Sequence, residues 1–213
     1  MNKRKYTKIK KVFMKNNGYA RTQDIIEAGI HTSYLYQLLE EGVISKIKRG
    51  LYHWENYSNS ANEEFISVSK IVPKGVFCLL SALSYYDITT INPWQYHVAI
   101  FRDNRKPVLP DYPPINIYYF SKEQYEIGIQ EINMNNHKIK IYDIEKTICD
   151  CLRYRNDIGM DIVKEALNEY VKREDRNIDK LLRYADKIGI YNLLNKYLEV
   201  LLWVVILKIW KLQ

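Results

Sequence analysis

The hydrophobic residues near the start of the chain recur with the spacing of a helix. In residues 5–16 lysines fill the outer faces, and the apolar side chains recur at helical spacing: Tyr6, Ile9, Val12 and Phe13. Asn17-Gly18 is a helix stop signal. A second short helix is predicted from Thr22, its expected N-cap, to Gly29, with Ile25 and Ile26 turned inward.

A third helix and a hairpin are predicted next. The helix opens at His31 or Thr32, closes at Gly42 and has an inward stripe of Leu35, Leu38 and Leu39. Residues 43–54 then show a strand–turn–strand pattern with Lys48-Arg49-Gly50 at its tip. Three helices followed by a hairpin predict a winged helix-turn-helix, whose third helix enters the DNA major groove.

Polar and aromatic positions of the third helix point away from its leucine stripe. They are Ser33, Tyr34, Tyr36 and Gln37. Gln can pair with adenine, a hydroxyl can bind base or phosphate, and an aromatic ring can pack on a thymine methyl. For each tyrosine, packing against the wing or the first helix is an equally weighted alternative. Three cations near the wing tip are candidate contacts for phosphates or a minor groove: Lys46, Lys48 and Arg49.

Charge is distributed unevenly along the chain. Residues 1–54 contain 11 Lys/Arg and 4 Asp/Glu, whereas residues 55–213 contain 21 of each. The net charge of +7 therefore lies on the N-terminal module alone. A basic module beside a neutral one favours a polyanion as partner of the first part. A basic solvated face without a partner is the alternative.

The remaining chain predicts a mixed domain after a polar linker at residues 56–62. A helix is expected at 63–71, followed by an apolar run at 76–80 that is a short strand or a buried helix start, and a helix at 81–86. Strands are expected at 96–101 and 115–120, separated by a charged, proline-rich loop, and a hairpin at 127–142 turns at Asn135-Asn136-His137. We predict an α+β protein with domains at 1–56 and 57–213, the second having a small sheet and a helical C-terminal half.

Helical patterns fill the chain from Asp143 onward. Asp143 can cap the first of these helices, and further amphipathic stretches cover 161–172, 179–188 and 191–202. The apolar segment 200–207 is far shorter than the roughly 20 residues of a membrane span. It predicts a C-terminal helix docked on the core, with a dimer contact or a peripheral membrane contact as the alternative.

No specific catalytic, metal or cofactor motif is evident. The three cysteines fit a reducing cytosol, and no apolar stretch follows the basic start as a signal peptide requires, so a cytoplasmic protein is expected. A nuclease-like acid cluster of Asp143, Glu145 and Asp150 is the enzymatic alternative. Against it, Asp143 and Glu145 should diverge, and Lys146 and Arg153 can pair with Asp143 and Asp150 at i,i+3.

Several stretches in order resemble the AbiEi family, antitoxins of type IV toxin–antitoxin systems linked to abortive phage infection. They are the helix-turn-helix closed by RGLYHW, the segment GVFCLLSALSYYDIT at 75–89, and IYDIEKTICDCLRYRNDIG with EALNEYVKR in the C-terminal half. Together they span about residues 5–202. No single motif is highly specific, and the tail after Leu202 has no counterpart.

The resemblance implies a DNA-binding repressor that recognises inverted repeats in the promoter of its own operon. It also implies a C-terminal domain that counters a nucleotidyltransferase-like toxin without a stable complex, and it supplies no catalytic residue. It adds Thr32 to the DNA-contact candidates of the third helix, and Arg21 is a further candidate for phosphate. A plain winged-helix regulator with an oligomerising or effector-binding C-terminal domain remains the main alternative.

Overall fold

In a computed structural model of the chain, residues 2–55, 57 and 63–210 are described, except for the side chains of residues 200 and 202–210. The chain divides into two compact units. The first comprises Met1–Pro73, Lys106–Pro114 and Asn133–Ile139, and the second comprises Lys74–Arg105, Ile115–Ile132 and Lys140–Gln213. The predicted boundary after residue 56 falls on a linker of which 56 and 58–62 lie outside the described residues, and it stays a prediction.

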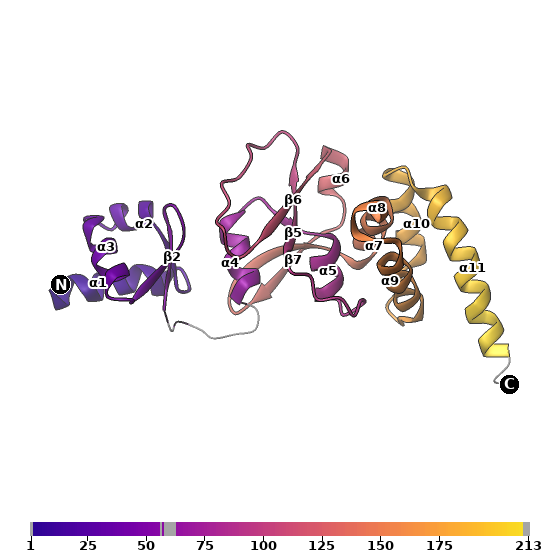
Figure 1. Ribbon diagram of the computed structural model, residues 1–213, viewed down its shortest axis with the longest axis horizontal. Helices are drawn as coiled ribbons and strands as arrows, with labels where there is room; N and C mark the ends of the chain where they lie inside the picture. Colours follow the sequence, from indigo (N-terminus) through magenta and orange to yellow (C-terminus); the bar gives the residue numbers. More distant parts are fainter. Residues whose placement is uncertain (1, 56, 58–62, 211–213) are drawn as a thin grey trace. The chain divides into compact units, whose positions relative to one another are not determined.

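The first unit contains three helices, a three-stranded sheet and a fourth helix (Figure 1). Its elements are α1 Lys3–Lys15, β1 Tyr19–Arg21, α2 Thr22–Glu27, α3 Ser33–Glu40, β2 Ile44–Lys48, β3 Leu51–Trp54 and α4 Glu63–Ile71. The sheet has the order β1-β3-β2, with both pairings antiparallel. This arrangement confirms the predicted winged helix-turn-helix.

The helix boundaries follow local chemistry. Asn2 caps α1 by accepting a hydrogen bond from the Arg4 backbone N–H at 3.0 Å. After α1 the chain turns through Asn17 and Gly18, whose φ angles are 52° and 86°, so the predicted stop is confirmed. On the inner face of α1, Phe13 packs edge-on against Trp54 of β3 at a ring-centroid distance of 5.3 Å.

Three details of the first unit differ from the sequence prediction. Thr22 is the first residue of α2 rather than its N-cap, because the backbone N–H of Arg21 donates to the Asp24 carboxylate at 2.6 Å. Ile25 is buried but Ile26 is 50% exposed, since a six-residue helix has room for one inward position per turn. The strand β1 was not predicted, because three residues are too few to show alternation.

The second unit contains most of a five-stranded sheet of order β6-β5-β4-β8-β7, and residues 133–139, at the ends of β7 and β8, belong to the first unit. The strands of this sheet are β4 Val76–Phe77, β5 Tyr96–Phe101, β6 Ile115–Phe120, β7 Ile129–Met134 and β8 His137–Tyr142. β5 runs parallel to β6 and antiparallel to β4. The apolar run at 76–80 forms both predicted alternatives in turn, because β4 leads directly into a buried helix.

Helices complete the second unit. They are α5 Leu79–Tyr85, α6 Lys122–Glu126, α7 Ile144–Arg153, α8 Arg155–Ile158, α9 Met160–Lys172, α10 Ile178–Lys187 and α11 Tyr191–Trp210. All of residues 144–152 of α7 are buried, and α7 packs against α5, α9 and α10. The described α+β architecture confirms the predicted fold class. The five-residue helix α6, capped by Ser121, was not predicted.

The C-terminal helix carries the apolar segment noted in the sequence. Its backbone is helical to Trp210, but the side chains of residues 200 and 202–207 in that segment lie outside those described. The docking and contact predictions for the segment therefore stay predictions. Among the described residues, no helix is both long and apolar enough to cross a membrane.

Candidate nucleic-acid interface

The N-terminal turn of helix α3 is capped by the residue before its N-cap. The side chain of Thr32, the N-cap residue, makes no capping hydrogen bond. Instead Nδ1 of His31 accepts a hydrogen bond from the Ser33 backbone N–H at 3.2 Å and lies 2.7 Å from the Ser33 hydroxyl. An imidazole therefore takes the capping role, and the hydroxyl of Ser33 is held at the start of the helix.

The outward positions of α3 have different surroundings. The ammonium of Lys5 in α1 lies 2.5 Å from the Tyr34 hydroxyl and 4.8 Å from its ring centroid, so Tyr34 packs against the first helix. Gln37 donates to the Glu41 carboxylate at 2.8 Å. Tyr36, by contrast, is 67% exposed. Of the two tyrosines predicted to contact DNA, Tyr36 is therefore the one whose ring is open to a groove.

Helix α1 adds two cations that the predicted site omitted. Besides Lys5 at Tyr34, the Lys8 ammonium lies 3.9 Å from the position a Cβ would take on Gly29, in the turn before α3. Both lysines are exposed. The lysine-rich outer faces of residues 5–16 were visible in the sequence, but their proximity to α3 depends on how α1 packs. Phosphates flanking a groove occupied by α3 would meet these ammonium groups.

The wing places its cations in two environments. Lys46 on β2 and Arg49 in the turn are exposed. Lys48 instead donates to the Ile71 carbonyl at 2.7 Å, at the last residue of α4. Burial, and secondarily the charge of Arg21, lowers the pKa of Lys48 below its ordinary value. The ammonium of Lys48 thus stabilises an unpaired helix-end carbonyl.

Arg21 shares this second environment. Its guanidinium donates to the Lys70 carbonyl at 3.0 Å, next to the carbonyl held by Lys48. Both residues were predicted to contact phosphate. In the described structure they hold the C-terminal end of α4, so a phosphate would have to compete with these hydrogen bonds. Lys46 and Arg49 face no such competition from a described hydrogen bond or ion pair.

The N-terminal module matches a known protein family. Residues 8–52, from within α1 to within β3, match the family model described as "Transcriptional regulator, AbiEi antitoxin". The module is an AbiEi antitoxin regulator domain. The match confirms the resemblance for this segment, and a transcriptional-regulator domain implies DNA as its partner. No curated protein matches the chain.

Outside the AbiEi domain, the acidic residues considered for a nuclease are held by lysines. The Lys180 ammonium lies 3.0 Å from Asp143 and 2.9 Å from Glu145. Asp143 and Glu145 therefore converge, contrary to prediction, because Asp143 is the N-cap of α7 and not part of the helix. The cation of Lys180 takes the position between the two carboxylates that a metal ion would need.

The predicted ion pairs along α7 were also wrong. Lys146 contacts Asp150 at 2.5 Å, one turn later, and only its backbone N–H binds Asp143, at 2.8 Å. Arg153 donates to the Ile188 carbonyl at 2.6 Å instead of pairing with Asp150. Lys146 and Asp150 are both buried, so the pair is shielded from solvent. Burial raises the pKa of Asp150, while the charge of Lys146 opposes that shift.

Proposed function

We propose that the protein is a sequence-specific DNA-binding repressor of its own operon. Two copies would bind an inverted repeat, with α3 of each in the major groove and the wing on the flanking backbone. The observation that carries this proposal is the coincidence of the AbiEi regulator domain with the part of the chain that holds the whole net charge of +7.

The proposed DNA-contacting residues are the predicted set, extended by α1. Tyr36, Ser33, Thr32 and Gln37 would face base edges, with Tyr34 beside them. Lys46, Arg49, Lys5 and Lys8 would face phosphates. Arg21 and Lys48 would join them only when released from the end of α4, because their hydrogen bonds to the carbonyls of Lys70 and Ile71 occupy them. Lys5 and Lys8 are supported by their exposure and by their position beside α3.

The same protein would act as the antitoxin of a type IV toxin–antitoxin system that limits phage infection. The description of the family matched by residues 8–52 supports this role. The resemblance of residues 75–89 to that family's segment after the linker, and of the α7–α9 region to its C-terminal helical half, supports it further. We propose that the C-terminal domain counters a nucleotidyltransferase-like toxin without forming a stable complex with it. It would act without catalysis, cofactor or metal, in the cytoplasm, where its three free thiols would stay reduced.

A paired assay in cells tests both roles. The full chain is expressed with a reporter driven by its own promoter and, separately, with the nucleotidyltransferase-like product expected from the neighbouring gene. The variant combining Tyr36→Ala with Arg49→Ala should release the reporter but still protect against the toxin. The matched control is Tyr191→Ala with Lys164→Ala, two exposed positions of the second unit. Repression that survives the first variant would remove α3 and the wing from the mechanism.

The alternative of a plain regulator gives a different outcome in the same assay. Such a protein would repress the reporter but leave the toxin's effect unchanged at every expression level. Full repression without any protection would therefore overturn the antitoxin half of the proposal while leaving the repressor half intact.

A further inference from the structure

A cavity of about 430 Å³ opens in the second unit, on the strands β5 and β6. It is also lined by the loop at residues 91–95 and by α8. This volume lies within the range of about 300–1,000 Å³ that is usual for small-molecule sites. Neither the AbiEi regulator domain nor the proposed repression uses it.

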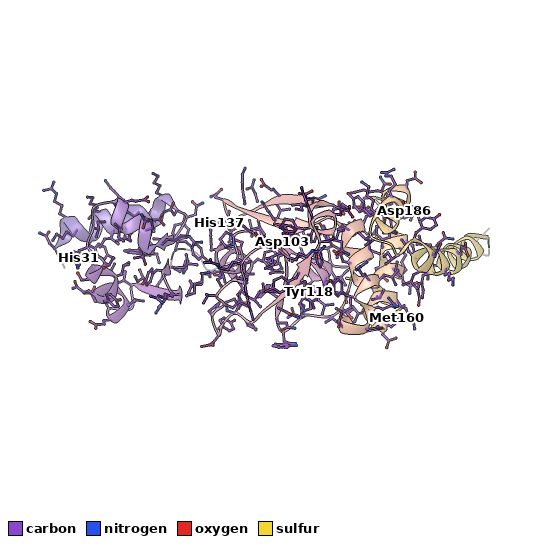
Figure 2. The ribbon with its side chains drawn as sticks, turned by 90° about the horizontal axis from the view of Figure 1, so that it is seen from above. His31, Asp103, Tyr118, His137, Met160 and Asp186 are labelled. Atoms are coloured by element: carbon purple, nitrogen blue, oxygen red, sulfur yellow. The ribbon has the colours of Figure 1, made fainter. Side chains whose placement is uncertain are left out.

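Aromatic rings form one part of the cavity wall. His97 of β5 and Tyr118 of β6 stack at a centroid distance of 5.3 Å and an interplanar angle of 25° (Tyr118 is labelled in Figure 2). Trp94, on the loop, also lines the cavity and is 78% exposed. Burial of the Trp94 indole contributes little to the stability of the free protein, because most of the ring is exposed. The exposed face of the indole is a surface on which a flat ring can stack.

Neutral polar groups form the other part. Three carboxamides line the cavity: Asn92, Gln95 and Asn116. Asn116 is oriented by the hydrogen bond that its amide donates to the Tyr118 hydroxyl at 3.1 Å. Carboxamides can donate and accept at once, which matches the edges of nucleobases.

Charge excludes some ligand classes. Asp157 is the charged residue among the described residues that line the cavity, and none of them is Lys or Arg. The imidazole adds no charge near neutrality, because burial lowers the pKa of His97 to about 4. The wall is therefore suited to a ligand part that is uncharged or donates hydrogen bonds, and unsuited to a phosphate.

One buried atom in the wall lacks a partner. His97 is 3% exposed, and its Nδ1 makes no hydrogen bond with any described residue. Buried polar atoms are nearly always paired, so the unpaired Nδ1 is unusual among the side chains that line the cavity.

We propose that this cavity binds a nucleobase, stacked on Trp94 and the Tyr118 wall and read at its edge by the carboxamides and Asp157. The carboxylate accepts from an exocyclic amine, so adenine, guanine and cytosine are bound in preference to uracil. The base belongs to a free nucleoside or to a single-stranded nucleic acid. The sugar and any phosphate lie outside the cavity.

The test is ligand binding to the full chain by isothermal titration calorimetry. The ligands are adenosine, guanosine, cytidine and uridine, with ribose as the control that lacks a base. Heptamer single-stranded RNAs of one base type form a second arm. Tighter binding of the oligomers than of the nucleosides, weakened by Trp94→Ala, assigns the site to single-stranded nucleic acid, whereas extra oligomer affinity that Trp94→Ala leaves unchanged belongs to the basic N-terminal module and assigns the cavity to free nucleosides. We expect adenosine, guanosine and cytidine each to bind more tightly than uridine, and ribose not to bind.

Variants locate the binding. Trp94→Ala should weaken it roughly five- to a hundredfold, the range expected for loss of one stacking partner. Asp157→Asn should reduce the preference over uridine. Tyr119→Ala, an exposed aromatic of β6 whose side chain alternates to the other face from Tyr118, is the matched control and should bind as the unaltered chain does. Far-ultraviolet circular dichroism verifies that each variant is folded.

Two results would overturn the proposal. One is the absence of base-dependent heat for every nucleoside and oligomer at millimolar concentration. The other is nucleoside binding that is the same in Trp94→Ala, Asp157→Asn and the unaltered chain. Neither result bears on repression by the AbiEi domain, because the cavity lies wholly in the second unit.

Discussion

Neighbouring residues of the wing make different contacts and should have different roles. Lys46 and Arg49 are exposed, and each should neutralise a phosphate when DNA binds. Replacing either with alanine should weaken binding to all sequences alike and flatten the plot of log affinity against log salt by about one unit. Fluorescence anisotropy at four salt concentrations measures this slope. Slopes equal to that of the unaltered chain would exclude both residues from the backbone contact.

Lys48 should behave differently from these neighbours. Its ammonium holds the Ile71 carbonyl at 2.7 Å, so Lys48→Ala should lower the free energy of unfolding by about 1–2 kcal/mol. Lys46→Ala, two residues earlier on the same strand, is the matched control and should change stability by less than about 0.5 kcal/mol. Urea denaturation separates the two. Equal stability of the variants would show that the contact with α4 contributes nothing measurable.

The recognition helix gives a second contrast between residues. Tyr36 is 67% exposed, whereas the Gln37 amide donates to Glu41 at 2.8 Å. Tyr36→Ala and Gln37→Ala should each relax the base preference at one operator position. For Gln37→Ala the loss of discrimination against the wrong base should be about 1–3 kcal/mol, since in the complex the amide leaves Glu41 and pairs with adenine. Selection of binding sequences from a random pool is the measurement. An unchanged selected sequence for Gln37→Ala would mean that Gln37 stays bound to Glu41.

At the scale of elements, the hairpin of β7 and β8 should give stability a pH dependence. The first residue of β8, His137, is 3% exposed, and its ring lies edge-on against Tyr19 at a centroid distance of 5.5 Å. Burial, with help from the charge of Lys70, lowers the pKa of His137 to about 4. Between about pH 6.5 and 4 the unfolded chain binds the proton and the folded chain does not. The stabilising contribution is therefore complete above pH 6.5 and is lost as the pH falls towards 4.

A variant tests this account of the hairpin. His137→Gln should show a shallower fall in the free energy of unfolding between pH 6.5 and 4.5 than the unaltered chain. His31→Gln, at an exposed histidine, is the control for a general effect of losing an imidazole. Denaturation at four pH values in this window gives the comparison. If His137→Gln keeps the full slope, other groups cause the pH dependence.

Elements with strong periodicity were predictable and short ones were not. The strands at 96–101 and 115–120 were predicted to the residue, because their apolar runs are bounded by turn residues and a proline-rich loop. β1 and α6, with three and five residues, leave too little pattern to detect. The Asp143 cap was predicted from local chemistry, but its pairing with Lys180 depends on how α10 packs beside α7.

The candidate interface shows the same division between local and tertiary information. The exposed positions of α3 and the wing follow from the leucine stripe and the hairpin pattern. The contacts of Arg21 and Lys48 with the end of α4 do not, because they join residues 49 and 23 positions apart in sequence. Lys5 and Lys8 were missed for a related reason, since only the packing of α1 brings them beside α3 and the turn before it.

Across the whole molecule, charge and family likeness agree on one division of labour. The AbiEi regulator domain covers residues 8–52, and the excess positive charge lies within residues 1–54. Residues 55–213 carry no net charge. The second unit contains carboxylates paired with lysine and a cavity lined by aromatic and carboxamide side chains that repression does not use. DNA binding should therefore be governed by the first unit and be insensitive to changes in that cavity.

Salt-dependent binding of the full chain to DNA from its own promoter tests this central claim most directly. Fluorescence anisotropy should show tighter binding to the promoter fragment than to a shuffled sequence of equal length. Affinity should fall steeply with salt, less steeply in the variant combining Lys46→Ala with Arg49→Ala, and as before in Trp94→Ala. Equal affinity for promoter and shuffled DNA, or a salt slope unchanged by the wing variant, would contradict the account.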